Sequence, residues 1–179
     1  MQRNLAISEE LGYQKGVAKA LNTLGDIYFY KKEYATSLDY YDRSIEVTKS
    51  IGNKLVLGFS LVEKGKVLLA TGNLPETSRH LQESLGIANE LQQPDLLMEV
   101  KLLSARLAIE KGETAGVEAI LTELLVQYPA RSDRAAIHYE WSKTETGSAH
   151  RNEALALYKA LYQETPVFVF KQRIAELER

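Results

Sequence analysis

The sequence of 179 residues is long enough for one ordinary domain with a buried core, and its 45% share of hydrophobic residues argues against a disordered chain. The 22 basic and 24 acidic residues are well mixed and give a net charge of −2, which argues against a surface for nucleic acid or an anionic membrane. The chain contains no cysteine, which excludes disulfides and fits a cytoplasmic location.

Apolar residues recur at helical spacing along the whole chain. In the first full unit, Leu21, Leu24 and Tyr28 belong to one stripe, and Tyr41 and Ile45 belong to a second. The sequence has no run of about 18 apolar residues, so no transmembrane helix is predicted, and the first ten residues do not resemble a signal peptide. In chain order, helices are predicted over residues 2–11, 14–31, 34–51, 54–71, 74–91, 94–111, 114–127, 131–145, 150–163 and 166–178.

The helices are expected to form one domain, 1–179, because no linker or low-complexity tract divides the sequence. Its predicted parts are a lone helix (1–12), four helix pairs (14–51, 54–91, 94–129 and 131–163) and a C-terminal capping helix (166–179).

The sequence repeats at an interval of 40 residues. Gly12 aligns with Gly52, and Gly72 aligns with Gly112. A small residue also recurs inside the first helix of each pair, where two helices can approach closely only if side-chain bulk is removed. These small residues are Gly25, Gly65, Ala105 and, in the fourth unit, Ser142.

The pattern Leu21-x2-Leu24-Gly25-x2-Tyr28, followed by Ser37-x3-Tyr41, resembles the tetratricopeptide repeat family. The later copies are more degenerate, and the 40-residue interval exceeds the family's usual length of about 34, as in a long-helix variant. The resemblance implies an all-α, right-handed superhelical solenoid of antiparallel helix pairs. It also implies a protein-binding module with a concave groove lined by the first helices of the pairs.

The chain is expected to begin in the middle of a repeat. Residues 3–7 align with residues 43–47 and 83–87, which belong to second helices of pairs. A solenoid end without a polar cap exposes apolar side chains, here around Leu5. We therefore expect this uncapped N-terminal end to be covered by another chain, and we predict self-association there.

The candidate catalytic and metal-binding residues are few. His80, His138 and His150 form no H-E-x-x-H pair, and their simplest role is packing or surface exposure. His138 and Ser142 lie one helical turn apart, but no orienting acid accompanies them. We expect no enzyme activity, no cofactor and no metal.

The partner-binding groove is predicted from positions that share one face of each first helix. Its members are Lys19, Asn22, Asp26, Phe29, Phe59, Val62, Lys66, Leu69, Glu99, Leu102, Arg106 and Ile109. The apolar members on 54–71, with Lys66 and Arg106, favour a peptide or protein segment with apolar anchors and some acidic residues. The alternative is that neighbouring side chains cover these positions and that they serve packing.

The predicted function is therefore a non-catalytic protein–protein interaction module, without a nucleic-acid or membrane partner. The alternative is a regulatory or sensor segment of a larger signalling protein, such as a kinase, a cyclase or a transcription regulator.

Overall fold

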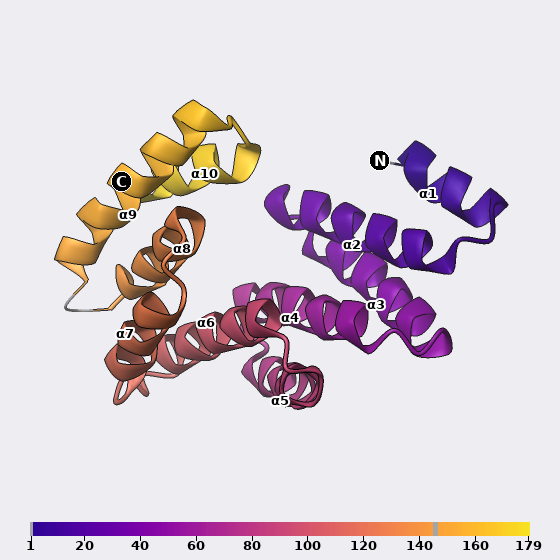
Figure 1. Cartoon of the computed structure of the whole chain (residues 1–179), viewed down its shortest axis with the longest axis horizontal. Helices are drawn as coiled ribbons and strands as arrows, with labels where there is room; N and C mark the ends of the chain where they lie inside the picture. The colour runs from indigo at the N-terminus through magenta and orange to yellow at the C-terminus, as the bar shows by residue number, and fades with distance from the viewer. Residues whose placement is uncertain (1, 145–146) are drawn as a thin grey trace. The chain divides into compact units, whose positions relative to one another are not determined.

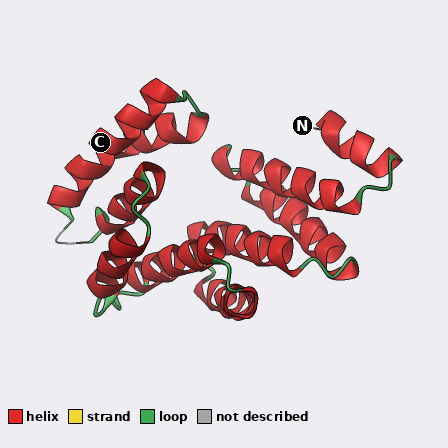
Figure 2. Cartoon of the chain, in the orientation of Figure 1, coloured by secondary structure: helices red, strands yellow, loops and turns green. Residues whose placement is uncertain are grey.

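The computed structural model describes residues 2–144 and 147–179, and this part of the chain is folded into ten α-helices without a β-strand (Figures 1 and 2). The helices are α1 (Gln2–Glu10), α2 (Gln14–Tyr30), α3 (Tyr34–Ser50), α4 (Lys54–Ala70), α5 (Leu74–Leu91), α6 (Pro94–Glu110), α7 (Val117–Gln127), α8 (Arg131–Trp141), α9 (Ser148–Glu164) and α10 (Phe168–Leu177). The all-α prediction is confirmed. Residue 1 of the predicted lone helix and residues 145–146 of the predicted pair 131–163 lie outside the described residues.

Two helix ends differ from the prediction by three or four residues. The helix predicted from 114 begins at Val117, because Gly116 has a φ of 90° that a right-handed helix does not allow. The helix predicted to reach 145 ends at Trp141, where the hydroxyl of Ser142 donates to the carbonyl of Tyr139 at 2.7 Å. Such local side-chain bonds compete with the helical ladder and end it.

A left-handed residue ends a helix every 20 residues along the first two thirds of the chain. The φ angles are 64° at Gly12, 62° at Lys32, 66° at Gly52, 78° at Gly72, 50° at Gln92 and 73° at Gly112. At each of these turns the next residue donates its N–H to a carbonyl five residues back, at 2.8 to 3.1 Å. This is the Schellman arrangement, which satisfies the last carbonyls of a helix. Each 40-residue repeat is therefore built from two 20-residue halves.

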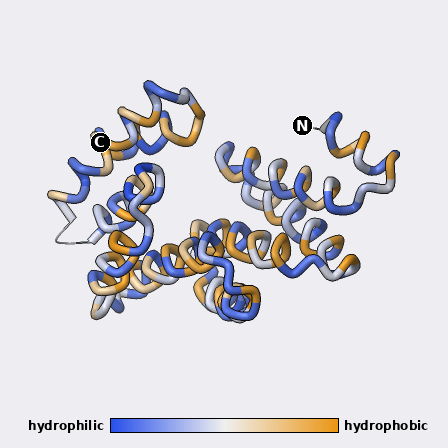
Figure 3. Tube along the Cα trace, in the orientation of Figure 1, coloured by the Kyte–Doolittle hydropathy of each residue, from blue (hydrophilic) through white to orange (hydrophobic). Residues whose placement is uncertain are grey.

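The helices divide into two compact units, residues 1–107 and 108–179. In the first unit, successive helices from α1 to α5 pack against one another, and α2 also contacts α4. Side chains of α3 to α6 share one apolar core, which includes Leu61, Val62, Leu81, Leu96 and Leu103. Hydrophobic and hydrophilic residues alternate along each helix in Figure 3, as expected for helices with one buried side.

The small residues that recur inside the first helices have the packing role that the sequence predicts, with one exception. A Cβ atom on Gly25 would lie 2.7 Å from the ring of Tyr41, and one on Gly65 would lie 2.9 Å from Leu103. Ala105 is completely buried. Ser142 lies beyond the end of α8 and is partly exposed, so its predicted packing role is wrong.

Hydrogen bonds between the helices of a pair repeat at the same interval. The hydroxyl of Ser44 donates to the carbonyl of Ala18 at 3.1 Å, and 40 residues later the hydroxyl of Ser84 donates to the carbonyl of Gly58 at 3.0 Å. A hydroxyl on the second helix thus binds a buried carbonyl of the first helix in two successive pairs. This hydrogen bond allows the serine hydroxyls to be buried without an unpaired polar group.

The second unit contains α7 to α10, each packed against the next. Its core is formed by Ala135, Tyr139, Ala154, Tyr158 and Leu177. No helix in the described part of the chain combines the length and the apolar composition that crossing a bilayer requires.

Candidate partner-binding face

The helices that carry the predicted groove, α2, α4 and α6, are joined by side-chain contacts in the first unit. The amide nitrogen of Asn22 on α2 donates to the hydroxyl of Ser60 on α4 at 2.9 Å. The ammonium of Lys66 on α4 lies 2.8 Å from a carboxylate oxygen of Glu99 on α6. We call the side of these helices that carries Asn22, Asp26, Lys66 and Glu99 the α2/α4/α6 face.

Three apolar residues predicted to line the groove belong to the core instead. The exposed fraction is 0% for Val62, 6% for Leu69 and 6% for Leu102. The expected apolar stripe of Phe59, Val62 and Leu69 is therefore wrong at Val62 and Leu69, and the packing alternative applies to all three buried residues. For Val62 and Leu69 on α4, the physical reason is that α4 contacts α2, α3 and α5, so its second apolar side is covered as well as its first.

The other predicted groove residues keep some accessible surface. Lys19 is exposed, whereas Asn22, Asp26, Phe29, Phe59, Lys66, Glu99, Arg106 and Ile109 are partly buried. Phe29 packs its ring against Tyr30 and Tyr34, with centroids 5.5 and 6.0 Å away. Ile109 belongs to the second unit and is not placed relative to the rest.

Four charged residues form a cluster on the α2/α4/α6 face, and we call Asp26, Glu63, Lys66 and Glu99 the charge cluster. Lys66 donates to Glu63 and to Glu99, each at 2.8 Å. Asp26 accepts a hydrogen bond of 2.6 Å from the hydroxyl of Tyr41. The cluster contains three carboxylates and one ammonium, so it carries an excess of negative charge when all four groups are ionised.

The electrostatics of the charge cluster follow from its burial. Burial raises the pKa of Asp26, although the hydrogen bond from Tyr41 and the charge of Lys66 oppose this rise. Burial also raises the pKa of Glu63, and the charges of Asp26 and Glu99 add to the rise, while Lys66 opposes it. Burial alone would lower the pKa of Lys66, but Glu63 and Glu99 raise it overall. The lysine stays charged, and its positive charge compensates the carboxylates incompletely.

Local packing positions Asp26 through Tyr41. The ring of Tyr41 lies directly over Gly25, where any Cβ atom would collide with it. Burial raises the pKa of Tyr41, so its phenol remains a hydrogen-bond donor to Asp26. The sequence identified Tyr41 as a packing residue and did not include Glu63 in the groove. The signal for Glu63 was its position three residues before Lys66, a spacing at which helical side chains meet.

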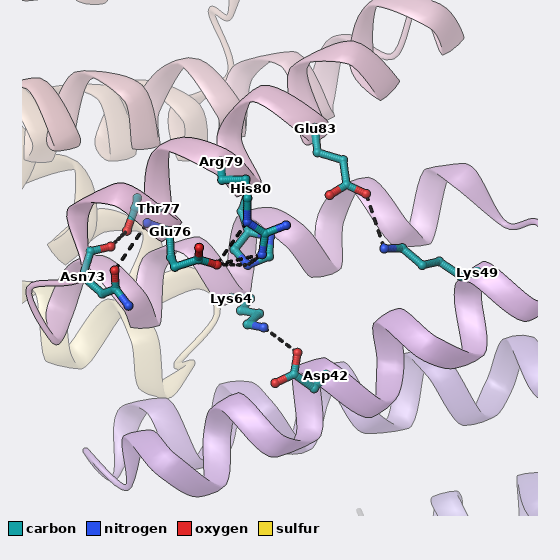
Figure 4. Close-up of polar contacts among 9 residues, drawn as sticks. All are labelled: Asp42, Lys49, Lys64, Asn73, Glu76, Thr77, Arg79, His80 and Glu83. Carbon is teal, nitrogen blue, oxygen red and sulfur yellow. Dashed lines mark hydrogen bonds and ion pairs between the residues drawn. The ribbon is translucent and has the colours of Figure 1, made fainter.

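A second group of polar contacts joins α3, α4 and α5 (Figure 4). Lys64 on α4 binds Asp42 on α3, and Lys49 on α3 lies 3.6 Å from Glu83 on α5. On α5, Glu76 binds Arg79 at 2.7 Å and lies 3.9 Å from His80. Ion pairs near the surface contribute little to stability, so this group has a modest structural role.

His80 is the buried member of this group. Burial lowers its pKa, and the nearby charges of Lys64 and Arg79 lower it further. Within residues 2–144 and 147–179, no three histidine, aspartate or glutamate side chains are grouped so as to hold a metal ion.

Comparison with known families identifies one segment of the chain. Residues 16–90 match the family model described as tetratricopeptide repeat. The match extends from the first turns of α2 to the end of α5, and it includes Gly25, Tyr41 and Gly65. A comparison with curated proteins gives no match.

Proposed function

Since residues 16–90 belong to the tetratricopeptide repeat family, we propose that the chain is a protein–protein interaction module whose α2/α4/α6 face binds a segment of another polypeptide. The observation that carries this proposal is the charge cluster. Polar groups that are partly withdrawn from water and incompletely compensated favour a ligand of the opposite charge.

The partner segment in this proposal carries a lysine or arginine side chain. Lys66 already binds two carboxylates, so it has little to offer to an acidic partner. An incoming cation, in contrast, would be attracted by Asp26, Glu63 and Glu99 together. The charge cluster thus favours a basic segment over the acidic one expected from the sequence.

Apolar contacts would accompany the charged one. Phe29 and Phe59 retain accessible surface on the same helices as Asp26 and Lys66. Aromatic side chains contribute large contact areas to interfaces and often provide their anchors. We therefore propose a segment that combines a cationic side chain with at least one apolar residue.

A peptide-display library panned against the full chain tests the proposal. The selected peptides should be enriched in lysine or arginine next to apolar residues, and their affinity should fall as the salt concentration rises. Glu99→Gln should weaken binding roughly tenfold, because it removes one carboxylate from the charge cluster.

The matched control is Glu46→Gln, which makes the same chemical change on the exposed side of α3. It should leave the affinity unchanged. Selection of acidic or purely apolar peptides, or equal affinities for the Glu99→Gln and Glu46→Gln variants, would refute the proposed partner chemistry.

A further inference from the structure

Two histidines meet between α8 and α9 in the second unit. Nδ1 of His138 lies 2.8 Å from Nδ1 of His150. The ring centroids are 5.0 Å apart and the ring planes differ by 23°. This centroid separation is about the N–N distance plus one ring radius on each side. The rings therefore lie edge to edge along the N–N line, and one Nδ1 donates a hydrogen to the lone pair of the other.

The contact limits how many protons the two rings can hold. One Nδ1 must carry a hydrogen and the other must not. The neutral pair meets this condition, and so does a pair with one extra proton, because that proton can occupy Nε2 of the donor ring. Two extra protons place N–H groups on both facing nitrogens and put two positive charges side by side.

The surroundings give the second proton little compensation. His138 is 7% exposed; burial lowers its pKa, and His150 and Arg134 lower it further, whereas Glu153 opposes them. Glu153 lies 3.5 Å from Arg134, so its negative charge is partly offset by this ion pair and compensates the histidines less.

The charged groups near α8 and on α10 already have hydrogen-bond partners, and the acidic residues of α7 face solvent. Lys143, two residues beyond the end of α8, donates to Glu140 on that helix at 2.6 Å. On α10, Arg173 and Glu176 both bind the hydroxyl of Tyr139. The acidic residues of α7, Glu118 and Glu123, are exposed.

We propose that the contact between α8 and α9 is a pH-operated latch. It is closed while the His138–His150 pair holds at most one extra proton, and it opens when both rings are cationic. Opening separates the two helices that form most of the core of this unit, including the edge-to-face contact of Tyr139 with Tyr158. Acid thereby exposes apolar surface of the second unit, independently of the α2/α4/α6 face.

The chain carries its own reporter of this contact. Trp141 is the single tryptophan, and its indole stacks on the ring of His150 at 3.9 Å with an interplanar angle of 8°. A protonated imidazole quenches indole fluorescence more strongly than a neutral one. A titration of the full chain from pH 8 to pH 4 should therefore follow the His150 ring through Trp141 emission, while NMR follows both histidines directly.

In the unmodified chain, the pair should take up its two extra protons in separate steps, the second at a pH below the ordinary histidine value. Hydrogen exchange of the α9 amides, corrected for its intrinsic pH dependence, should rise at least tenfold across the second step. In the His138→Gln variant, the second step of proton uptake should be absent, and the rise in α9 exchange should disappear.

The His150→Gln variant keeps the test decisive if the buried His138 tolerates no replacement, because His150 is only partly buried. It should likewise remove the rise in α9 exchange. Proton uptake by the two histidines without a separate second step in the unmodified chain would overturn the proposal. So would a rise in α9 exchange that persists in either variant.

Discussion

Replacing Gly25 by alanine should destabilise the first unit, although alanine is the better helix former. The new Cβ atom would lie 2.7 Å from two ring atoms of Tyr41 and 3.0 Å from a third. Tyr41 is 1% exposed, and its hydroxyl is held by Asp26 at 2.6 Å, so the ring cannot move without losing that bond. Overpacking costs about 1–3 kcal/mol, and a hydrogen bond to a charged group contributes about 1.5–3 kcal/mol.

The gain in helix propensity is about 1 kcal/mol, so the net loss for Gly25→Ala should be about 1.5–5 kcal/mol in the free energy of unfolding. Gly86→Ala is the matched control, because Gly86 lies within α5 and its Cβ would meet nothing within 4 Å. That variant should gain up to about 1 kcal/mol.

Urea denaturation followed by circular dichroism measures both changes. Adding Tyr41→Leu to Gly25→Ala should cost less than the sum of the two single changes, because the smaller side chain relieves the collision. A Gly25→Ala variant as stable as Gly86→Ala would refute the close packing of α2 against Tyr41.

Three further predictions concern the turns, the core and the response to pH. Lys32→Gly and Gln92→Gly should each raise the free energy of unfolding by about 0.5–1 kcal/mol, because both positions have a positive φ that glycine adopts without strain. The control Lys31→Gly, at a φ of −77°, should lower the free energy of unfolding in the same urea experiment. Val62→Asp should unfold the first unit because it places a charge at a fully buried position, whereas Lys19→Asp should keep the helical circular dichroism signal. Equal helical signals from the two variants would contradict the burial of Val62. The pKa of His80 is lowered in the folded chain, so the unfolded chain binds more protons as the pH falls below about 6.5. The free energy of unfolding should therefore be highest above that pH and fall as the pH approaches the folded-state pKa of His80. His80→Gln should flatten this part of the pH profile, and an unchanged slope would contradict the prediction.

The sequence predicted the helices well because local signals define their ends. From α2 to α6, every helix begins at its predicted first residue and ends within one residue of its predicted last residue. Glycine at positions 12, 52, 72 and 112 gave the signal at four turns. Lys32 and Gln92 adopt the same left-handed conformation without a glycine, so the 20-residue half-repeat was not apparent from the sequence.

The candidate site was harder to predict because its formation depends on contacts between distant residues. Helical spacing shows that Phe59, Val62 and Leu69 share a face, but it does not show which neighbouring helix covers that face. The hydrogen bond from Tyr41 to Asp26 joins two helices, and the ion pair of Lys66 with Glu99 joins two others. Neither contact has a local sequence signature, whereas the pairing of Glu63 with Lys66 within α4 does.

NMR mapping of a peptide from the display library onto the full chain tests the central claim most directly. Saturating the chain with that peptide should shift the amide signals around Asp26, Lys66 and Glu99, on three helices that are separated in sequence. The signals of exposed residues on α3 and α5, such as Glu46 and Glu90, should stay in place. Shifts concentrated on α3 and α5, with the α2/α4/α6 face unchanged, would contradict the assignment of this face as the binding surface.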